Sequence, residues 1–118
     1  MQRSIRLRLN DIIRAIDGAE VTIESAEFET FQSVYHMART AERSIEIISE
    51  ASRHVPQALK DQHPDIPWKQ IAGIGNILRH DYGIVDDHIT WDVVKSHFPS
   101  LRAAVVEMLA KLPEDDDS

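Results

Sequence analysis

Apolar residues recur along the chain at intervals of three and four, the spacing that one buried face of an α-helix produces. From Leu9 to Ile23 this spacing predicts a first helix, with polar residues on its other face. Between residues 25 and 54 the chain contains no Pro or Gly, and a longer periodic stretch there predicts the longest helix. The apolar face of this helix is expected to hold Phe31, Val34, Tyr35, Ala38, Ala41, Ile45 and Ile48. Val55-Pro56 and the prolines in residues 62–67 then enclose a connector with one short helix, because proline disfavours helix in the residue before it.

Three further helices are expected in the C-terminal half, with boundaries set by Pro, Asp and Gly. Pro67 suits the first position of one helix, and Gly83 suits its end, where a left-handed residue is most easily adopted. The two helices that follow are expected from Asp86 or Asp87 to about His97, and from Pro99 or Ser100 to Leu112. No strand-like alternation, hairpin dipeptide or repeat appears, so the sequence predicts an all-α fold, an antiparallel bundle of four to five helices.

Length and composition limit what this bundle can be. The 118 residues suffice for one modest core, so we expect a single domain over residues 1–112 and a disordered acidic tail over residues 113–118. The absence of cysteine excludes disulfides, thiolate zinc sites and cysteine nucleophiles, and it favours the cytoplasm. No apolar run approaches the roughly 20 residues that span a bilayer, and the start lacks the apolar stretch of a signal peptide, so no membrane association is expected.

The charge is unevenly distributed along the chain. A net charge of −7 argues against a protein that coats nucleic acid non-specifically, but much of this charge lies in the tail. The first segment is basic, because it contains Arg3, Arg6, Arg8 and Arg14. We interpret these arginines as a solvated helix face, with contact to RNA as the alternative.

The helix expected after Pro67 has a polar seam beside an apolar one. At about 100° per residue, one narrow sector holds Lys69, Gly73, Asn76 and His80, and the adjacent sector holds Trp68, Ile71, Gly75, Leu78 and Tyr82. Asn76 and His80 are four residues apart, so Asn76 can orient the imidazole or share a phosphate oxygen with it. A lone histidine in a helix is more often structural, and that alternative stays open.

Two glycines, Gly73 and Gly75, oppose helix formation in this segment by roughly 1 kcal/mol each relative to alanine. A close approach at this point explains them, made by a backbone of the same chain, by a dimer mate or by a substrate. Apolar residues also lie on more than one side of this helix, which is more than a small bundle needs to cover. Dimerisation through the helix is therefore expected.

Three stretches of the chain resemble the HepT-like branch of the HEPN superfamily. They are residues 66–82, which end in GNILRHDY, residues 89–94, and residues 43–51 further upstream. The similarity extends over nearly the whole chain apart from the acidic tail, in the right order. The resemblance implies a homodimeric HEPN-like bundle that acts as a metal-independent endoribonuclease. It also implies the role of toxin in a toxin–antitoxin pair, with an MNT-type minimal nucleotidyltransferase as antitoxin.

The resemblance assigns the catalytic motif to an Arg, a His and a Tyr, and this chain matches it at His80 and Tyr82. Most relatives have the Arg where this chain has Gly75, so we hypothesise that Arg79, one turn later, takes its place. The alternative is a degenerate site. Histidine can make the proton transfers of RNA cleavage and a guanidinium can stabilise the developing charge. Two such helices across a dimer axis would supply acid and base, leaving 2′,3′-cyclic phosphate and 5′-hydroxyl ends.

By the same resemblance, the antitoxin transfers AMP from ATP to Tyr82, which adds charge and bulk beside the RNA site and inactivates the toxin. The alternative for Tyr82 is simple packing at a helix end. Two other functions stay open for the whole chain. One is a catalytically silent HEPN module that binds and serves a nucleotidyltransferase, which Gly75 favours. The other is a structural helical dimer, which leaves the polar seam unused.

Two acidic residues are expected to support the site from a second layer, Glu50 and Asp81. Glu50 and its neighbour Glu46 are expected as buried partners of Arg43 or Arg79, a role that is usually structural. The remaining histidines lack the paired spacing with carboxylates that metal sites use, so no metal and no cofactor are expected. We expect them at the surface, and they are His36, His54, His63, His88 and His97.

Overall fold

A computed structural model of the chain describes the backbone of residues 4–80 and 87–113, and the side chains of residues 4–74 and 87–113. Over these ranges the chain is helical and contains no strand, which confirms the all-α prediction. The elements are α1 (Ile5–Ile23), α2 (Phe28–Ser33), α3 (Tyr35–Ser52), α4 (Gln57–Lys60), α5 (Trp68–His80), α6 (Asp87–Asp92), the π-helix η1 (Val93–His97) and α7 (Phe98–Lys111).

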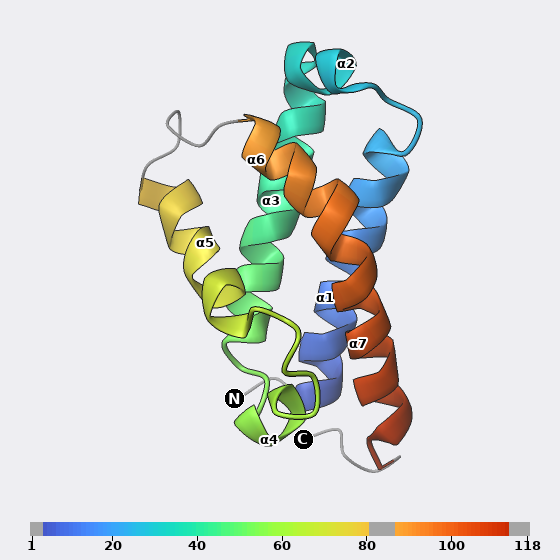
Figure 1. The fold of residues 1–118 in the computed structure, drawn as a ribbon, viewed down its shortest axis with the longest axis vertical. Coiled ribbons are helices and arrows are strands. Elements are labelled where there is room, and N and C mark those ends of the chain that lie inside the picture. Colours follow the sequence, from blue (N-terminus) through green and yellow to red (C-terminus); the bar gives the residue numbers. More distant parts are fainter. Residues whose placement is uncertain (1–3, 81–86, 114–118) are drawn as a thin grey trace.

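The long helices form a bundle in which α3 lies between α1 and α5, while α7 packs along α1 (Figure 1). Helix α1 begins four residues before the expected Leu9, because the Ser4 hydroxyl accepts a hydrogen bond of 3.1 Å from the Leu7 amide and caps the helix. The apolar faces of these helices meet in one core. Its fully buried large residues are Leu9, Ile12, Ile16, Ile23, Phe31, Val94, Val105 and Met108.

The prediction of one long helix between residues 25 and 54 is wrong. Val34 has φ −94° and ψ 105°, an extended conformation that separates α2 from α3, so α3 is one residue shorter than α1. The break lets α2 turn Phe31 fully into the core, with its ring centroid 5.0 Å from that of Trp91. Phe28 stacks on His88 at 4.0 Å between ring centroids. Burial of aromatic surface from a distant segment therefore outweighs the local helical pattern.

The last two expected helices are joined. The boundary at His97 lies where the sequence placed it, but α6, η1 and α7 follow one another without a loop, as one bent helical path (Figure 1). Pro99 occupies the first turn of α7, where its missing amide hydrogen is tolerated. The π-helical turn η1, just before α7, accommodates the bend between α6 and α7.

The connector and the termini complete the fold. A short helix, α4, is present in the connector as expected, and α5 begins at Trp68, directly after Pro67. The predicted end of this helix at Gly83 and most of the acidic tail lie outside the described residues. In the described part of the chain, no helix is both long and apolar enough to cross a membrane.

Candidate functional site

Helix α5 carries the polar seam and is positioned mainly by α3 (Figure 1). The hydroxyl of Ser49, a fully buried residue of α3, donates a hydrogen bond of 2.8 Å to the carbonyl of Ala72 in α5. Next to it, Ile71 and Ile74 pack their partly buried side chains against the core. A buried hydroxyl needs a partner, so this bond fixes how α5 lies on α3.

The start of α5 is held by its connector. The indole Nε1 of Trp68 donates a hydrogen bond of 3.1 Å to the carbonyl of His63. The ammonium of Lys60 lies 5.9 Å from the centroid of the Trp68 ring, and burial lowers the pKa of Lys60. These contacts close the loop between α4 and α5 and give α5 a fixed origin.

The predicted catalytic residues lie on the last two turns of α5. Asn76, Arg79 and His80 all belong to this helix, which places them along one rigid element, although their side chains are outside the described ones. Asp81 and Tyr82 lie beyond the helix, outside the described residues. The assignments of these five residues therefore remain predictions about a helix whose placement is known.

The structure narrows the explanation for the glycines of α5. A Cβ atom added to Gly73 would meet no atom of the described residues within 4 Å outside its own helix. The expected close approach by a backbone of the same chain is therefore wrong at this position. Gly75 lies outside the described side chains. A second copy and a substrate are the explanations that stay in place for Gly73.

Glu50 lies on the exposed side of α3 and is not the buried partner that the sequence suggested. Its side chain is 52% exposed and accepts hydrogen bonds from Arg53 at 2.6 Å and His54 at 3.1 Å. These bonds, that of Arg53 first, hold the pKa of Glu50 below its ordinary value. Glu46 pairs loosely with Arg43, with 3.8 Å between nitrogen and oxygen. The role of Glu50 behind the catalytic group stays a prediction.

A polar pocket of about 220 Å³ lies between α1 and α3. It is lined by Arg8, Asp11, Arg43, Glu46, Ile47, Glu50 and Ala51. The expected basic first segment is thus balanced by acidic residues where it meets α3. Arg8 of the basic first segment and Glu50, the expected supporting residue of the site, therefore line the same pocket.

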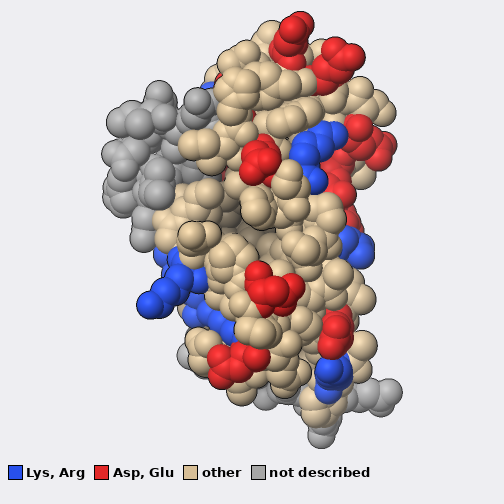
Figure 2. All heavy atoms as spheres, in the orientation of Figure 1, with Lys and Arg blue, Asp and Glu red and all other residues tan. Residues whose placement is uncertain are grey.

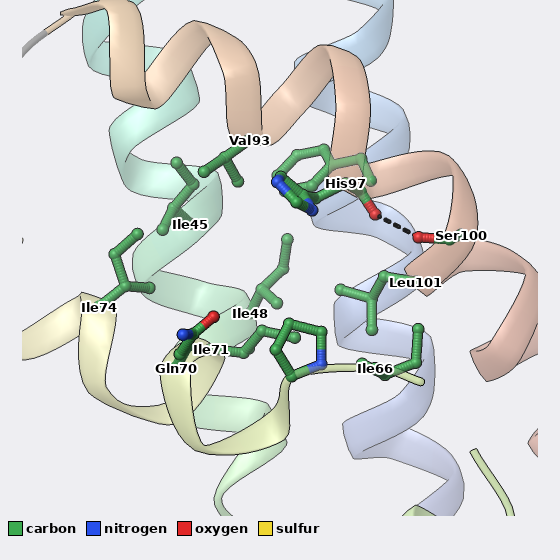
Figure 3. Close-up of a pocket in the computed structure, with 12 residues that line it drawn as sticks. Ile45, Ile48, Ile66, Gln70, Ile71, Ile74, Val93, His97, Ser100 and Leu101 are labelled. Atoms are coloured by element: carbon green, nitrogen blue, oxygen red, sulfur yellow. Dashed lines mark hydrogen bonds between the residues drawn. The ribbon is translucent and has the colours of Figure 1, made fainter. Parts of the chain in front are cut away.

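A second pocket, of about 140 Å³, was not anticipated from the sequence. It lies beneath α5, on the side facing η1 and α7, and its floor is aliphatic (Figure 3). Ile71 and Ile74 of α5 line it, together with Ile45 and Ile48 of α3, and Gln70, His97 and Ser100 contribute its polar atoms. The feature of the sequence that could have indicated this pocket is the presence of apolar residues on more than one side of α5. Of the apolar residues on α5, Ile71 and Ile74 face this pocket, and uncharged side chains dominate the middle of this face (Figure 2).

The other histidines are distributed as expected, with one exception. His36, His54, His88 and His97 are exposed, whereas His63 is half-buried. Among the described residues, no group of three or more His, Asp or Glu side chains could hold a metal ion.

Comparison with known proteins settles the family. The profile of the family described as "Ribonuclease HepT-like" matches residues 12–108, which include the whole of α3 and α5 and most of α1 and α7. The chain belongs to the HepT-like ribonuclease family. The resemblance carried by GNILRHDY and its flanking segments is thereby confirmed.

Relatives of this HepT-like chain have names consistent with the family. "Probable ribonuclease HepT" of Thermococcus cleftensis is 37% identical over 102 residues, 86% of this chain and 93% of the relative. "Putative RNase TTE0752" of Caldanaerobacter subterraneus is 35% identical over 103 residues, 87% of this chain and 92% of the relative. A protein of Methanocaldococcus jannaschii, "Gamma-glutamylcyclotransferase and putative RNase MJ0434", is 30% identical over 119 residues, and this chain matches 53% of its length. No solved structure matches the chain significantly.

Proposed function

We propose that the protein is a metal-independent endoribonuclease in which α5 supplies the reacting groups. The observation that carries the proposal is the match of the ribonuclease family over residues 12–108, with His80 on the last turn of α5, the helix that the Ser49 hydrogen bond joins to α3. In this proposal His80 transfers protons to and from the RNA 2′-hydroxyl and the leaving oxygen. Asn76, one turn earlier, orients the imidazole or the phosphate. Residues 1–112 act as one domain, in the cytoplasm.

The proposed reaction is an internal transfer. The 2′-oxygen of one ribose attacks the adjacent phosphorus, the bond to the 5′-oxygen of the next nucleotide breaks, and that oxygen takes up a proton. The products are a 2′,3′-cyclic phosphate and a 5′-hydroxyl, and no water or metal ion takes part. Charge develops on the phosphoryl oxygens during this step, and a guanidinium is suited to stabilise it. We assign that role to Arg79.

The test is cleavage of a 5′-labelled RNA by the purified protein in the presence of EDTA, with the end groups of the products identified. His80→Ala is expected to slow cleavage roughly 100- to 10,000-fold, the usual contribution of a positioned general acid or base. His97→Ala is a matched control, because His97 is an exposed histidine of η1, outside the helix α5 that carries the proposed reacting groups, and its replacement is expected to leave the rate unchanged. Equal rates for the His80 variant and the unmodified protein would remove the proposed role of His80.

Gly75 favours a second candidate function, a HEPN module that has lost cleavage and only binds a nucleotidyltransferase. Two variants separate the candidates. If Arg79 has replaced the missing arginine, Arg79→Ala abolishes cleavage by the otherwise active protein. If the site is degenerate, the unmodified protein does not cleave RNA, and Gly75→Arg restores the motif and with it the activity.

We further propose that the enzyme is a homodimeric toxin, controlled by an MNT-type nucleotidyltransferase that transfers AMP to Tyr82. The open space at Gly73 is consistent with a second copy beside α5. Mass spectrometry after incubation with ATP and such a partner is expected to show one added AMP on the wild-type protein and none on Tyr82→Phe. Inhibition without any added mass would show that the partner acts by occlusion.

A further inference from the structure

The first residue of α3 is a tyrosine in an unusual position. Tyr35 is 75% exposed, more than any other large hydrophobic residue recorded in the described part of the chain. The guanidinium of Arg39 lies 5.1 Å from the centroid of its ring. Arg43 follows after another four residues, so the three side chains form one stripe along α3, which we call the Tyr35 stripe. An aromatic ring that leaves one face open beside arginines is a surface on which a nucleobase can stack.

The two arginines of the Tyr35 stripe are each paired with a glutamate three residues later on the same helix. Arg39 forms an ion pair with Glu42, and Arg43 lies 3.8 Å from Glu46. The arginine side chains are 44% and 71% exposed, respectively. A guanidinium has five N–H donors, so each of these exposed arginines can donate to a phosphate group while it keeps its pairing with Glu42, which is only 16% exposed, or with Glu46.

Tyr35, at the start of the stripe, lies beyond the C-terminal end of α5 and toward the side of α3 that faces α5, whereas Arg43 lines the polar pocket between α1 and α3. The two helices are antiparallel, and the bond from Ser49 to Ala72 sets their register (Figure 1). Tyr35 is fourteen residues from Ser49, and His80 is eight residues from Ala72. At about 1.5 Å per residue, Tyr35 therefore lies about 9 Å further along the bundle than His80. At about 100° per residue, a rotation of only about 40° around the α3 axis separates the position of Tyr35 from that of Ser49, which faces α5.

This spacing suits a strand of RNA whose scissile phosphate is at His80. Together with the roughly 8–10 Å between two packed helices, the offset of about 9 Å gives a separation of about 12–13 Å, a span of about three to four nucleotides at about 3.4 Å per residue in a stacked strand. We propose that Tyr35 and Arg39 form a stacking platform for one unpaired base of the RNA, next to the site of cleavage. Stacking requires a free base face, so the platform selects single-stranded RNA and discriminates little between bases. The inference rests on the proposed ribonuclease function.

Binding of a fluorescein-labelled, unstructured RNA by the full-length protein tests the platform. The RNA carries a 2′-deoxy nucleotide at the mapped cleavage position, which removes the attacking hydroxyl and keeps the RNA intact. Tyr35→Ala is expected to raise the Kd roughly 5- to 150-fold, the loss of one stacked base. Tyr35→Phe keeps the ring and is expected to bind normally. Val21→Ala truncates another exposed side chain, 70% exposed, and serves as the matched control.

A set of RNAs with single abasic positions locates the base. One abasic position within about four nucleotides of the cleavage site is expected to weaken binding to the wild-type protein by the same factor as Tyr35→Ala. The same abasic RNA is expected to bind Tyr35→Ala with no additional loss, because the two changes remove one contact. Binding of the fully duplexed RNA is expected to be equal for both proteins.

Three results would overturn the platform while leaving the ribonuclease in place. The first is that the wild-type protein cleaves RNA while Tyr35→Ala leaves the Kd for RNA unchanged. The second is that Tyr35→Phe loses as much affinity for RNA as Tyr35→Ala. The third is that the Tyr35→Ala protein sediments as smaller species than the wild-type protein. The last result would assign Tyr35 to a contact between copies. If the wild-type protein neither binds nor cleaves RNA, the proposed function fails first and the platform fails with it.

Discussion

Replacing Ser49 with alanine removes the hydroxyl that joins α3 to α5, and its effect can be worked out from the structure. Ser49 is fully buried, and its hydroxyl donates a 2.8 Å hydrogen bond to Ala72. The loss of one such bond is expected to lower the free energy of unfolding by about 1 kcal/mol, within a range of about 0.5–1.5 kcal/mol. That is about a five-fold change in the unfolding equilibrium, or a fall of roughly 3–6 °C in Tm.

Ser52 provides a matched control for this change. It is equally buried, but its hydroxyl donates to the carbonyl of Ser49 in its own helix, also at 2.8 Å. A serine bonded back to its own helix adds little stability, so Ser52→Ala is expected to lower the free energy of unfolding by only about 0.5 kcal/mol. Only Ser49→Ala loosens the contact between two helices.

Amide hydrogen exchange distinguishes the two effects. Ser49→Ala is expected to speed exchange in α5 more than in α1, because α5 depends chiefly on α3 for its place. In Ser52→Ala, exchange in α5 and α1 should rise by similar factors, following the global stability. The reasoning is refuted if exchange in α5 is unchanged in Ser49→Ala, or if the two variants change α5 equally.

Three further predictions concern other parts of the fold. Gly73→Ala is expected to raise the free energy of unfolding by about 0.8–1 kcal/mol in urea titrations, because its Cβ meets no neighbour; a loss of dimer in sedimentation would instead place a second copy there. Phe31→Ala is expected to lower it by about 3–5 kcal/mol, since the ring is fully buried beside Trp91; a loss below about 1 kcal/mol would contradict this packing. The hydrogen bond from Arg102 lowers the pKa of Asp17, so the pair stabilises the fold above pH 3.8, the ordinary pKa of Asp17, and its contribution disappears as the pH falls through the lowered value. Asp17→Asn is therefore expected to lower the free energy of unfolding by about 0.2–1 kcal/mol at pH 7 and by less in acid. An effect that does not depend on pH would contradict the stabilising role of the Asp17–Arg102 pair.

Much of the fold follows from local chemistry that can be read along the chain. The prolines around the connector and Pro67 at the start of α5 act through covalent geometry, so their consequences do not depend on distant residues. The amphipathic spacing of α1 and α7 likewise specifies which faces are buried. Where local preference and tertiary packing agree, sequence reasoning succeeds.

The break at Val34 shows where sequence reasoning fails. Nothing in the local pattern interrupts the helix there, because the benefit comes from burying Phe31 against Trp91, sixty residues away. The same break makes Tyr35 the first residue of α3 and leaves its ring exposed. The Tyr35 stripe therefore could not be found from periodicity, which assigned Tyr35 to the buried face of one long helix.

For the candidate site, the sequence by itself determined the family and the helix that carries Asn76, Arg79 and His80, because these depend on residue types at fixed spacing along one element. Only the tertiary structure decided what surrounds that helix. It gave α5 its bond to Ser49, left Gly73 in open space and placed Glu50 at the surface with Arg53 and His54. These features are contacts between elements or exposures to solvent. Both depend on how helices pack, which no local pattern encodes.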